Sequence, residues 1–330
     1  MRLVQLKGPD GRRLATVEEP HLRLLEDCAS VYELAWQALH DGISLIPYVR
    51  QNLSATALDY EEIYAGKSVW NILPAADFPS EPARCLVSGT GLTHKASAKN
   101  RDAMHAAAQA VTDSTRMYLS GLEGGRPAAG EIGVAPEWFY KGCGSVLRAH
   151  NEPLAVPEHA EDGGEEPEIA GIYIIDSAGV PRRIGFAVGN EFSDHLFEKK
   201  NYLYLAASKL RNCSIGPELV LDNSFDDVPG EVAVERAGKV IWSRAIHTGE
   251  NAMCHSLANM EHHHFKFEGH RRPGDLHVHF FGADAFSFGE GLLLDDGDIM
   301  QIRFDGFGRA LRNPLQRIAP SRKPVSVTKI

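Results

Sequence analysis

The stretch Glu166-Pro-Glu168-Ile-Ala-Gly-Ile-Tyr-Ile-Ile175 joins two carboxylates to an apolar run. The length of the run and its isoleucines predict a buried strand over residues 169–175. Alternate residues of a strand point to the same side, so the side chains of Glu166 and Glu168 converge. Two buried like charges cost free energy unless a cation or a proton neutralises them. Because oxygen ligands suit Mg²⁺, Mn²⁺ or Ca²⁺, one interpretation is a metal site. The other is a solvated acidic loop, since residues 158–166 are rich in acids.

Short β-branched or alternating runs surround this stretch, and Gly, Asp and Pro turns separate them. Such runs predict strands. The predicted strands cover residues 169–175, 184–188, 232–246, 276–280 and 299–304. We therefore expect an α+β, β-rich fold, with the strands forming a sandwich or a roll.

The first part of the chain has a different pattern. An extended MRLVQL segment and a GPDGRR turn precede apolar residues at helical spacing over residues 31–49. We predict a small N-terminal α+β domain over residues 1–80, with a Pro- and Asp-rich linker at 72–81. The main domain then covers residues 85–318, with a helix at 101–119, and residues 319–330 form a tail.

Composition excludes several classes of protein. The 330 residues include 34 basic and 44 acidic residues, for a net charge of −10. No basic stripe could follow a phosphate backbone, so we expect no nucleic-acid partner. No apolar run approaches the roughly 20 residues that a membrane span needs, and the start lacks the pattern of a secretory signal. We therefore expect no membrane partner and a cytoplasmic location. Five widely spaced cysteines without a CxxC pair are expected to be reduced thiols.

Other polar residues lie close to predicted strands. Glu191 follows the apolar run that ends at residue 188, with Gly189 and Asn190 between them, so it is a candidate third carboxylate. Glu137 and Lys141 lie among Trp138, Phe139 and Tyr140, where a carboxyl could have a raised pKa and carry a proton. Taken singly, each of these residues is equally compatible with an ordinary surface position.

Five motifs follow one another between residues 85 and 317: Pro136-Glu137-x-Phe139-x-Lys141, Gly144-Ser145-Val146, Glu166-x-Glu168-Ile-Ala, Gly185-x-x-x-x-Asn190-Glu191 and Lys209-x-x-x-x-Ser214-Ile-Gly-Pro217. In order and spacing this series resembles the fumarylacetoacetate hydrolase superfamily. The resemblance implies a mixed β-sandwich roll for the main domain, assembly as a homodimer or tetramer, and Mg²⁺ or Mn²⁺ as cofactor. It assigns the metal to Glu166, Glu168 and Glu191. The third ligand is commonly Asp in that superfamily, so Glu191 is a departure.

Two features favour one branch of the superfamily. Its hydrolases usually carry a G-L-N-Y segment followed by a His and a Glu on a lid, whereas this chain reads Gly91-Leu-Thr-His94. Glu137, together with a lysine eighteen residues after the third ligand, resembles the 2-keto-3-deoxy-pentonate dehydratases. That likeness implies that Glu137 and Lys209 transfer protons while the substrate becomes 2,5-dioxopentanoate, a step of non-phosphorylative pentose breakdown. Which of the two is the base stays open.

The small 2-keto acid substrate also needs binding groups. Our candidates are Lys141, Ser145, Arg148 and His279, although Arg148 is also compatible with a structural salt bridge. His277 and His279 share one strand face with Asp275 nearby, but the glycine expected before the first histidine of a cupin-type metal motif is out of register. We therefore expect His279 to face a substrate hydroxyl or to be a hydrogen-bonded interior histidine. The run Glu261-His-His-His264 is expected to form a solvated face or an interface.

Two other functions remain open at this stage. The same scaffold supports metal-dependent hydrolysis of a carbon–carbon bond in 2,4-diketo acids. A non-catalytic sugar-acid binding protein would need the metal but no proton carriers, which Glu137 and Lys209 argue against.

Overall fold

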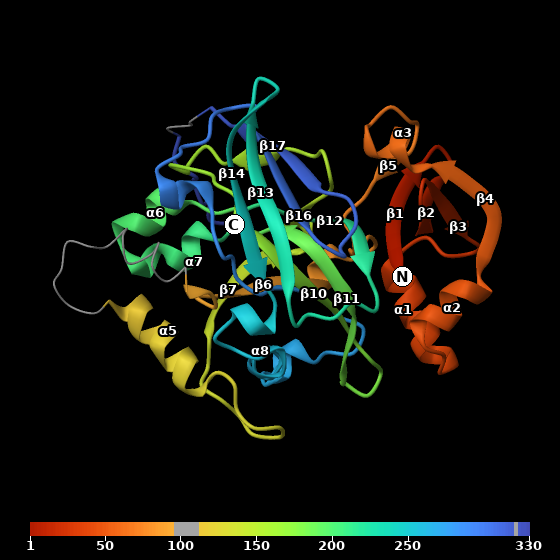
Figure 1. Ribbon diagram of the computed structural model, residues 1–330, viewed down its shortest axis with the longest axis horizontal. Coiled ribbons are helices and arrows are strands. Elements are labelled where there is room, and N and C mark those ends of the chain that lie inside the picture. Colours follow the sequence, from red (N-terminus) through yellow and green to blue (C-terminus); the bar gives the residue numbers. More distant parts are fainter. Residues whose placement is uncertain (96–111, 320–322) are drawn as a thin grey trace.

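The computed structural model describes residues 1–95, 112–319 and 323–330. In these residues the chain forms two β-sheets with short helices around them (Figure 1). The main path of the larger sheet runs, in spatial order, through β4 (Leu53–Asp59), β3 (His21–Leu25), β2 (Gly11–Glu18), β1 (Arg2–Gly8), β12 (Cys213–Val220), β11 (Pro181–Asn190), β10 (Pro167–Ile175), β15 (Leu276–Phe280), β6 (Cys85–Gly91) and β7 (Glu137–Cys143). Two short strands extend it, β5 (Asn71–Ile72) beside β1 and β8 (Leu147–Arg148) beside β12.

The smaller sheet has the order β14 (Lys239–Thr248), β13 (Val228–Arg236), β16 (Ile299–Phe304), β17 (Leu311–Arg317) and β9 (Leu154–Val156). The α-helices of the described residues are α1 (Val31–Asp41), α2 (Leu45–Gln51), α3 (Tyr60–Tyr64), α5 (Asp113–Gly124), α6 (His195–Lys200), α7 (Leu205–Ser208) and α8 (Leu257–Phe265). Most strand pairs are antiparallel, but β6 and β15 run parallel. The mixed, β-rich architecture that we predicted is thus confirmed.

The larger sheet has two buried faces, and β10 contributes to both. Ala170, Ile172 and Ile174 pack in the core that also contains Val31 and Leu34 of α1. The intervening Ile169, Tyr173 and Ile175 pack in a second core, which includes Val232 and Ile302 of the smaller sheet and Met260 of α8. The apolar run of β10 is therefore continuous because both of its faces are covered.

Two predicted elements are each divided by a turn. The helix predicted over 31–49 is two helices, because α1 ends at Gly42, whose positive φ of 66° suits a residue without a Cβ. The strand predicted over 232–246 is the hairpin of β13 and β14. Its turn residues Ala237 and Gly238 have φ values of 49° and 75°, the backbone that two-residue hairpin turns require. Apolar periodicity continues across both turns and conceals them.

The N-terminal residues extend the larger sheet. Figure 1 shows β1 to β4 and α1 to α3 on one side of the remaining chain, and β1 is hydrogen-bonded to β12 through Arg2 and Leu3. A separate core includes Val4, Leu22 and Tyr60 and uses only residues before position 80. The division into domains at 1–80 and 85–318 stays a prediction.

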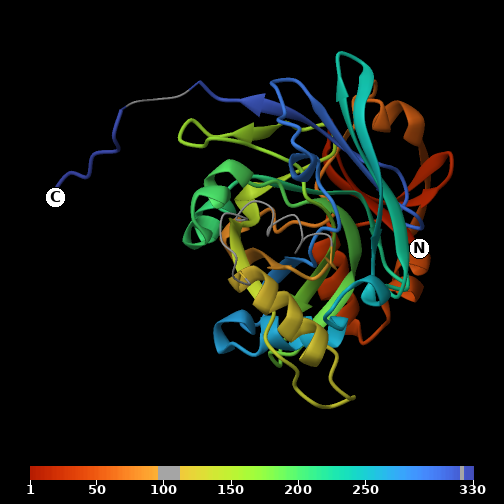
Figure 2. The same cartoon turned by 60° about the vertical axis from the view of Figure 1, so that its left-hand side comes forward.

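Some predictions fall near the ends of the described ranges. The helix predicted over 101–119 begins outside the described residues, and α5 forms its final part. Residues 323–330 have no regular secondary structure and extend away from the body of the protein (Figure 2). No helix of the described ranges is both long and apolar enough to cross a membrane.

Candidate active site

Three glutamates converge where β10 begins and β11 ends. Glu168 pairs with Gly189 across the two strands, and the backbone N–H of Glu191 donates to the carbonyl oxygen of Glu166 at 3.0 Å. This register brings Glu191 beside the Glu166 and Glu168 pair, and one oxygen of each carboxylate lies within 4.8 Å of the others. All three residues are buried. The predicted convergence of these carboxylates is confirmed, and we call the side of the larger sheet that carries them the acidic face.

The ammonium group of Lys209 contacts this cluster of carboxylates. Lys209 caps the C-terminus of α7 and is buried, and its ammonium lies 2.7 Å from Glu166 Oε1 and 2.5 Å from Glu191 Oε2. It also donates to Ser193 Oγ at 2.9 Å and lies 4.9 Å from the centre of the Phe139 ring. The predicted proton carrier is thus in direct contact with two of the three predicted metal ligands.

The electrostatic balance of the cluster is negative. Burial, and then the carboxylates of Glu191 and Glu166, raise the pKa of Glu168 well above its usual value. Burial also acts to raise the pKa of Glu166, but Lys209 and His195 together outweigh it and lower that pKa well below its usual value. Glu168 accepts a hydrogen bond from the backbone N–H of Gly282 at 2.7 Å. Among the described residues it has no cationic partner within salt-bridge distance, so the cluster has room for one more positive charge.

The donor set fits a hard divalent cation. Three buried carboxylates offer only oxygen ligands, which Mg²⁺ and Mn²⁺ prefer and which soft metals do not. Two ammonium groups offset two of the three negative charges, and a bound cation would relieve the repulsion that raises the pKa of Glu168. The residues present therefore suit the ion that the sequence predicts.

Strand β7 places Glu137 on the acidic face. Its burial alternates, so that Glu137, Phe139 and Lys141 are buried while Trp138 and Tyr140 are about one-third exposed. The expected ring cluster around Glu137 is therefore corrected, because two of the three rings point to the opposite side of the strand. The carboxylate instead accepts a hydrogen bond from the hydroxyl of Tyr202 at 3.0 Å.

Two glycines of β6 make room for these side chains. Gly91 pairs with Glu137, and a Cβ at Gly91 would lie 2.0 Å from Glu137 Oε1. Gly89 pairs with Phe139, and a Cβ there would lie 2.4 Å from its ring. The carboxylate and the ring therefore lie directly over the backbone of the neighbouring strand.

Lys141 is used differently from our prediction. Its ammonium is fully buried and lies 2.5 Å from Oε1 of Glu191. It also donates to the carbonyl oxygens of Glu191 and Phe192. The ammonium is thus engaged inside the protein by two hydrogen bonds and one ion pair. Lys141 thus holds the third carboxylate in place, which corrects the substrate contact that we expected for it.

Of the two positions that we expected for His279, the interior one is confirmed and the contact with a substrate hydroxyl is corrected, because the ring lies on the other side of the sheet. It pairs with Gly171 of β10. Gly171 points to the opposite side of the strand from Glu168 and Ala170, which lie on the acidic face. Its Nδ1 and Nε2 form hydrogen bonds of 2.8 Å with Ser88 and Thr90 of β6. His279 is therefore an interior histidine with both ring nitrogens satisfied and no free group for a substrate.

The histidines of α8 pack on the same side as His279. His264 is buried, forms a 3.0 Å hydrogen bond with His277 and accepts one from the Trp138 indole. We expected a solvated face or an interface for the 261–264 run. The solvated face is wrong for His263 and His264, which are buried against the loop before β7 and against β15. Burial and the neighbouring histidines lower the pKa of His264, so the cluster favours neutral rings.

Ser145 and Arg148 lie just after β7. Ser145 is exposed, and its hydroxyl is 3.1 Å from the Cys143 sulfur. Arg148 Nη1 donates to the carbonyl oxygens of Ser145 and Leu147. The side chains of both residues thus bond to neighbours within residues 143–148. Their contact with a substrate stays a prediction.

Sequence reasoning missed three contributors to the site. Ser193 donates to Glu191 Oε2 at 3.0 Å, His195 lies 3.1 Å from Glu166 Oε1, and the backbone N–H of Gly282 donates to Glu168. The Asn190-Glu-Phe-Ser-Asp-His195 segment offered a signal for the first two, because polar residues two and four positions after a ligand can return to it. Gly282 acts through its backbone and leaves no such signal.

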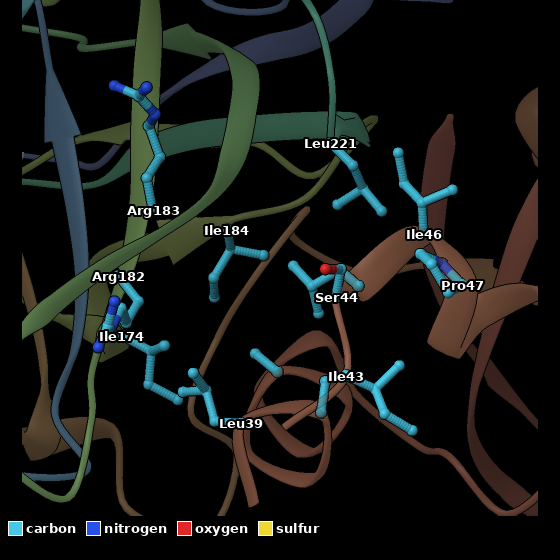
Figure 3. Close-up of a pocket in the computed structure, with 13 residues that line it drawn as sticks. Leu39, Ile43, Ser44, Ile46, Pro47, Ile174, Arg182, Arg183, Ile184 and Leu221 are labelled. Carbon is cyan, nitrogen blue, oxygen red and sulfur yellow. The ribbon is translucent and has the colours of Figure 1, made fainter. Parts of the chain in front are cut away.

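A separate cavity of about 450 Å³ lies between α1, α2 and strands β10 and β11. Figure 3 shows Leu39, Ile43 and Ile46 on one side of it, across from Ile174, Ile184 and Leu221. Ile174 is six residues along β10 from Glu168, so the cavity lies about 20 Å from the carboxylates. Its lining is apolar apart from Ser44, Arg182 and Arg183, and it has no part in the acidic site.

No family model matches the chain. The protein named "Probable 2-keto-3-deoxyxylonate dehydratase" of Haloferax volcanii is 31% identical over 183 residues, which are 52% of this chain and 58% of that protein. The match therefore spans less than two thirds of the relative.

Solved structures match over almost the whole chain. The structure of 2-keto-3-deoxy-D-arabinonate dehydratase complexed with magnesium and 2,5-dioxopentanoate has a TM-score of 0.71 at 18% identity, and the match covers 97% of this chain and 100% of that one. The 5-carboxymethyl-2-hydroxymuconate delta-isomerase of Mycobacterium smegmatis has a TM-score of 0.60 at 18% identity over the same shares. This chain thus has the fold of the fumarylacetoacetate hydrolase superfamily, as the order of its motifs predicted.

Proposed function

We propose that this protein is a Mg²⁺-dependent dehydratase that converts a 2-keto-3-deoxy-pentonate to 2,5-dioxopentanoate. The observation that carries the proposal is the contact between Lys209 and two of three clustered carboxylates, with Glu137 on the same face of the sheet. A site that only held a cation would not need a buried ammonium against its ligands. The dehydratase names of the Haloferax relative and of the magnesium-bound structure support the same chemistry.

In this proposal Glu166, Glu168 and Glu191 hold the cation, which could also be Mn²⁺. When bound, the cation supplies Lewis acidity beside the 2-keto group and so makes the C3 protons of the substrate easier to remove. Lys141 and Ser193 keep Glu191 oriented through the contacts described above. Ser145 and Arg148 are the candidates for binding the substrate hydroxyls or carboxylate.

Glu137 and Lys209 would move the protons. One of them takes a proton from C3 and the other delivers one to the C4 hydroxyl, which leaves as water. A proton then leaves C5 and one is added at C3, which gives an enol between C4 and C5. Protonation of C4 and loss of the proton on the C5 hydroxyl turn this enol into the aldehyde. The products are 2,5-dioxopentanoate and one water. The net reaction needs no oxidant, because the loss of water and the shift of hydrogen balance it.

Hydrolysis of 2,4-diketo acids is the rival activity on this fold. His94, which stands in the segment where the hydrolases carry G-L-N-Y, forms hydrogen bonds with Thr93 and Thr248. Burial, and then His247, lower the pKa of His94 to about 3. Both ring nitrogens of this histidine are engaged inside the protein, so the ring has no free nitrogen to activate water, which supports dehydration over hydrolysis.

The test supplies purified protein with a 2-keto-3-deoxy-pentonate and MgCl₂ and follows 2,5-dioxopentanoate through an aldehyde dehydrogenase. We expect turnover that EDTA abolishes and Mg²⁺ restores. Lys209→Met should lower kcat by at least about 10³-fold while the variant still binds substrate. Lys199→Met, an exposed lysine of α6, is the matched control and should be fully active. Release of pyruvate from a diketo acid, with no dehydration, would identify a hydrolase instead.

A cytoplasmic location and assembly as a homodimer or tetramer also belong to this proposal. The 2,5-dioxopentanoate in the magnesium-bound structure, which is the product in our proposal, supports a role in metabolism.

A further inference from the structure

His195 is buried at the first position of α6 and is clamped between two phenylalanine rings. Its ring centre lies 4.8 Å from that of Phe286 and 5.0 Å from that of Phe288, with interplanar angles of 4° and 26°. Gly164 faces the ring edge, and a Cβ there would lie 2.7 Å from His195 Nδ1. The imidazole therefore has little freedom to turn.

The polar contact of this ring is with a carboxylate of the acidic cluster. His195 Nε2 lies 3.1 Å from Glu166 Oε1, the same oxygen that Lys209 contacts at 2.7 Å. Within the described part of the chain, the buried Nδ1 has no hydrogen-bond partner. The ring is thus held so that one nitrogen meets Glu166 while the rest of it contacts apolar groups.

The clamp is tied back to the strand that carries Glu166. Ser287 lies between the two phenylalanines in sequence, and its backbone N–H and hydroxyl donate to the buried carboxylate of Glu165 at 2.6 and 2.9 Å. Glu165 and Glu166 are consecutive, so one residue anchors the phenylalanine segment and the next meets the histidine which that segment holds. His195, Phe286, Ser287, Phe288 and Glu165 therefore form one continuous ring of contacts that begins and ends at Glu166.

We propose that His195 is a positioning residue that fixes the Glu166 carboxylate for metal binding, and that Glu165 and Ser287 support it by holding the two stacking rings. A glutamate side chain has three rotatable bonds, and two donors on one oxygen restrict them before the cation arrives. Residues that hold a metal ligand by a hydrogen bond commonly contribute about 10- to 100-fold in metal affinity. This inference rests on the metal centre of the proposed function.

Two substitutions separate the stacked ring from the hydrogen-bond donor. His195→Phe keeps an aromatic ring between Phe286 and Phe288 but removes the donor. His195→Gln loses the ring but keeps an N–H donor near the position of Nε2. The measurement is Mn²⁺ affinity of the metal-free protein, by calorimetry and by the electron paramagnetic resonance signal of free Mn²⁺.

We expect His195→Phe to weaken Mn²⁺ binding by about 10- to 100-fold, and His195→Gln to stay within about threefold of the wild type. Thermal unfolding of the metal-free variants reports whether the fold is intact. If His195→Phe does not fold, Ser287→Ala provides the second test, because it removes one of the two hydrogen bonds that hold the phenylalanine segment and leaves the ring unchanged. It should lower affinity by several fold.

The inference would be overturned if folded His195→Phe bound Mn²⁺ as tightly as the wild type. The same holds for Ser287→Ala where that variant serves as the test. Equal losses in His195→Phe and His195→Gln would also overturn it, because the donor would then be irrelevant. If the wild type binds no Mn²⁺, the metal centre and this inference both fail. If the wild type dehydrates nothing but His195→Phe still loses affinity, the positioning role stands and only the dehydratase proposal fails.

Discussion

Replacing Glu168 with glutamine should change two properties of this protein in opposite directions. Glu168→Gln keeps the shape of the side chain and an oxygen that can accept from the Gly282 N–H, but it removes one negative charge from the cluster. Without metal, the variant should be more stable than the wild type. With Mg²⁺, it should gain almost nothing from the ion.

The magnitude follows from the geometry. Two unit charges 4.8 Å apart repel by about 3.5 kcal/mol at an effective dielectric constant of about 20. The ammonium groups of Lys141 and Lys209 offset part of this repulsion, and protonation of Glu168 relieves more. We therefore expect the metal-free variant to gain about 1 to 3 kcal/mol in unfolding free energy at pH 7. The gain should shrink as the pH falls, since the raised pKa of Glu168 means that the wild-type residue takes up a proton first.

Urea unfolding with and without MgCl₂ measures both effects. At a concentration 100-fold above its Kd, Mg²⁺ should stabilise the wild type by about 2.7 kcal/mol and the variant by less than about 0.5 kcal/mol. Glu218→Gln is the matched control, because Glu218 of β12 is equally buried but bonds to Arg2 of β1 and Tyr60 of α3. It should keep the full response to Mg²⁺. A metal-free Glu168→Gln that is less stable than the wild type, with an unchanged Mg²⁺ response, would refute the reasoning.

Two further predictions concern the proton carrier and the interior histidines. Gly91→Ala places a Cβ where the Glu137 carboxylate lies. The displaced carboxylate should lower kcat by about 100-fold, while Mg²⁺ still stabilises the protein. An unchanged kcat would show that Glu137 need not lie there. Burial lowers the pKa values of His94, His277 and His279 to about 3, so their contribution to stability is complete above pH 6.5 and is lost as the pH falls below it. Together these three rings should contribute a loss of about 4 kcal/mol to the unfolding free energy between pH 7.5 and 5.5, at about 1.36 kcal/mol per histidine per pH unit. Urea unfolding at the two pH values measures the change, and equal stability would contradict the neutral-ring assignment.

The local elements that we predicted best are those with strong apolar runs between turn residues. The strands at 276–280 and 299–304 have the predicted bounds, and β10 differs only at its start. The prediction failed where a run crosses a turn, at Gly42 and at Ala237–Gly238, because burial on both sides of the turn preserves the periodicity. A glycine directly after Asp41 was the available signal for the first of these.

For the candidate site, spacing along one strand was enough for Glu166 and Glu168, because the two-residue period of a strand is a local property. The position of Glu191 after a second apolar run made it a candidate, but its approach to the pair, like that of Lys209, was assigned from the resemblance of motifs, since neither spacing nor periodicity relates separate elements. Lys141 and His279 were assigned to the substrate because they carry suitable chemistry, and the structure uses both in interior contacts.

The amino-acid sequence by itself determined that two carboxylates begin a buried strand, that the fold is rich in strands, and that the charge balance disfavours nucleic acid. Only the tertiary structure decided which side of the sheet each group occupies. The pairing of β10 with β11 brings Glu191 to the acidic face, while the pairing of β15 with β10 and β6 turns His279 to the opposite one. The physical reason is that strand register is set by pairing between distant segments, and a shift of one residue moves every side chain to the other face.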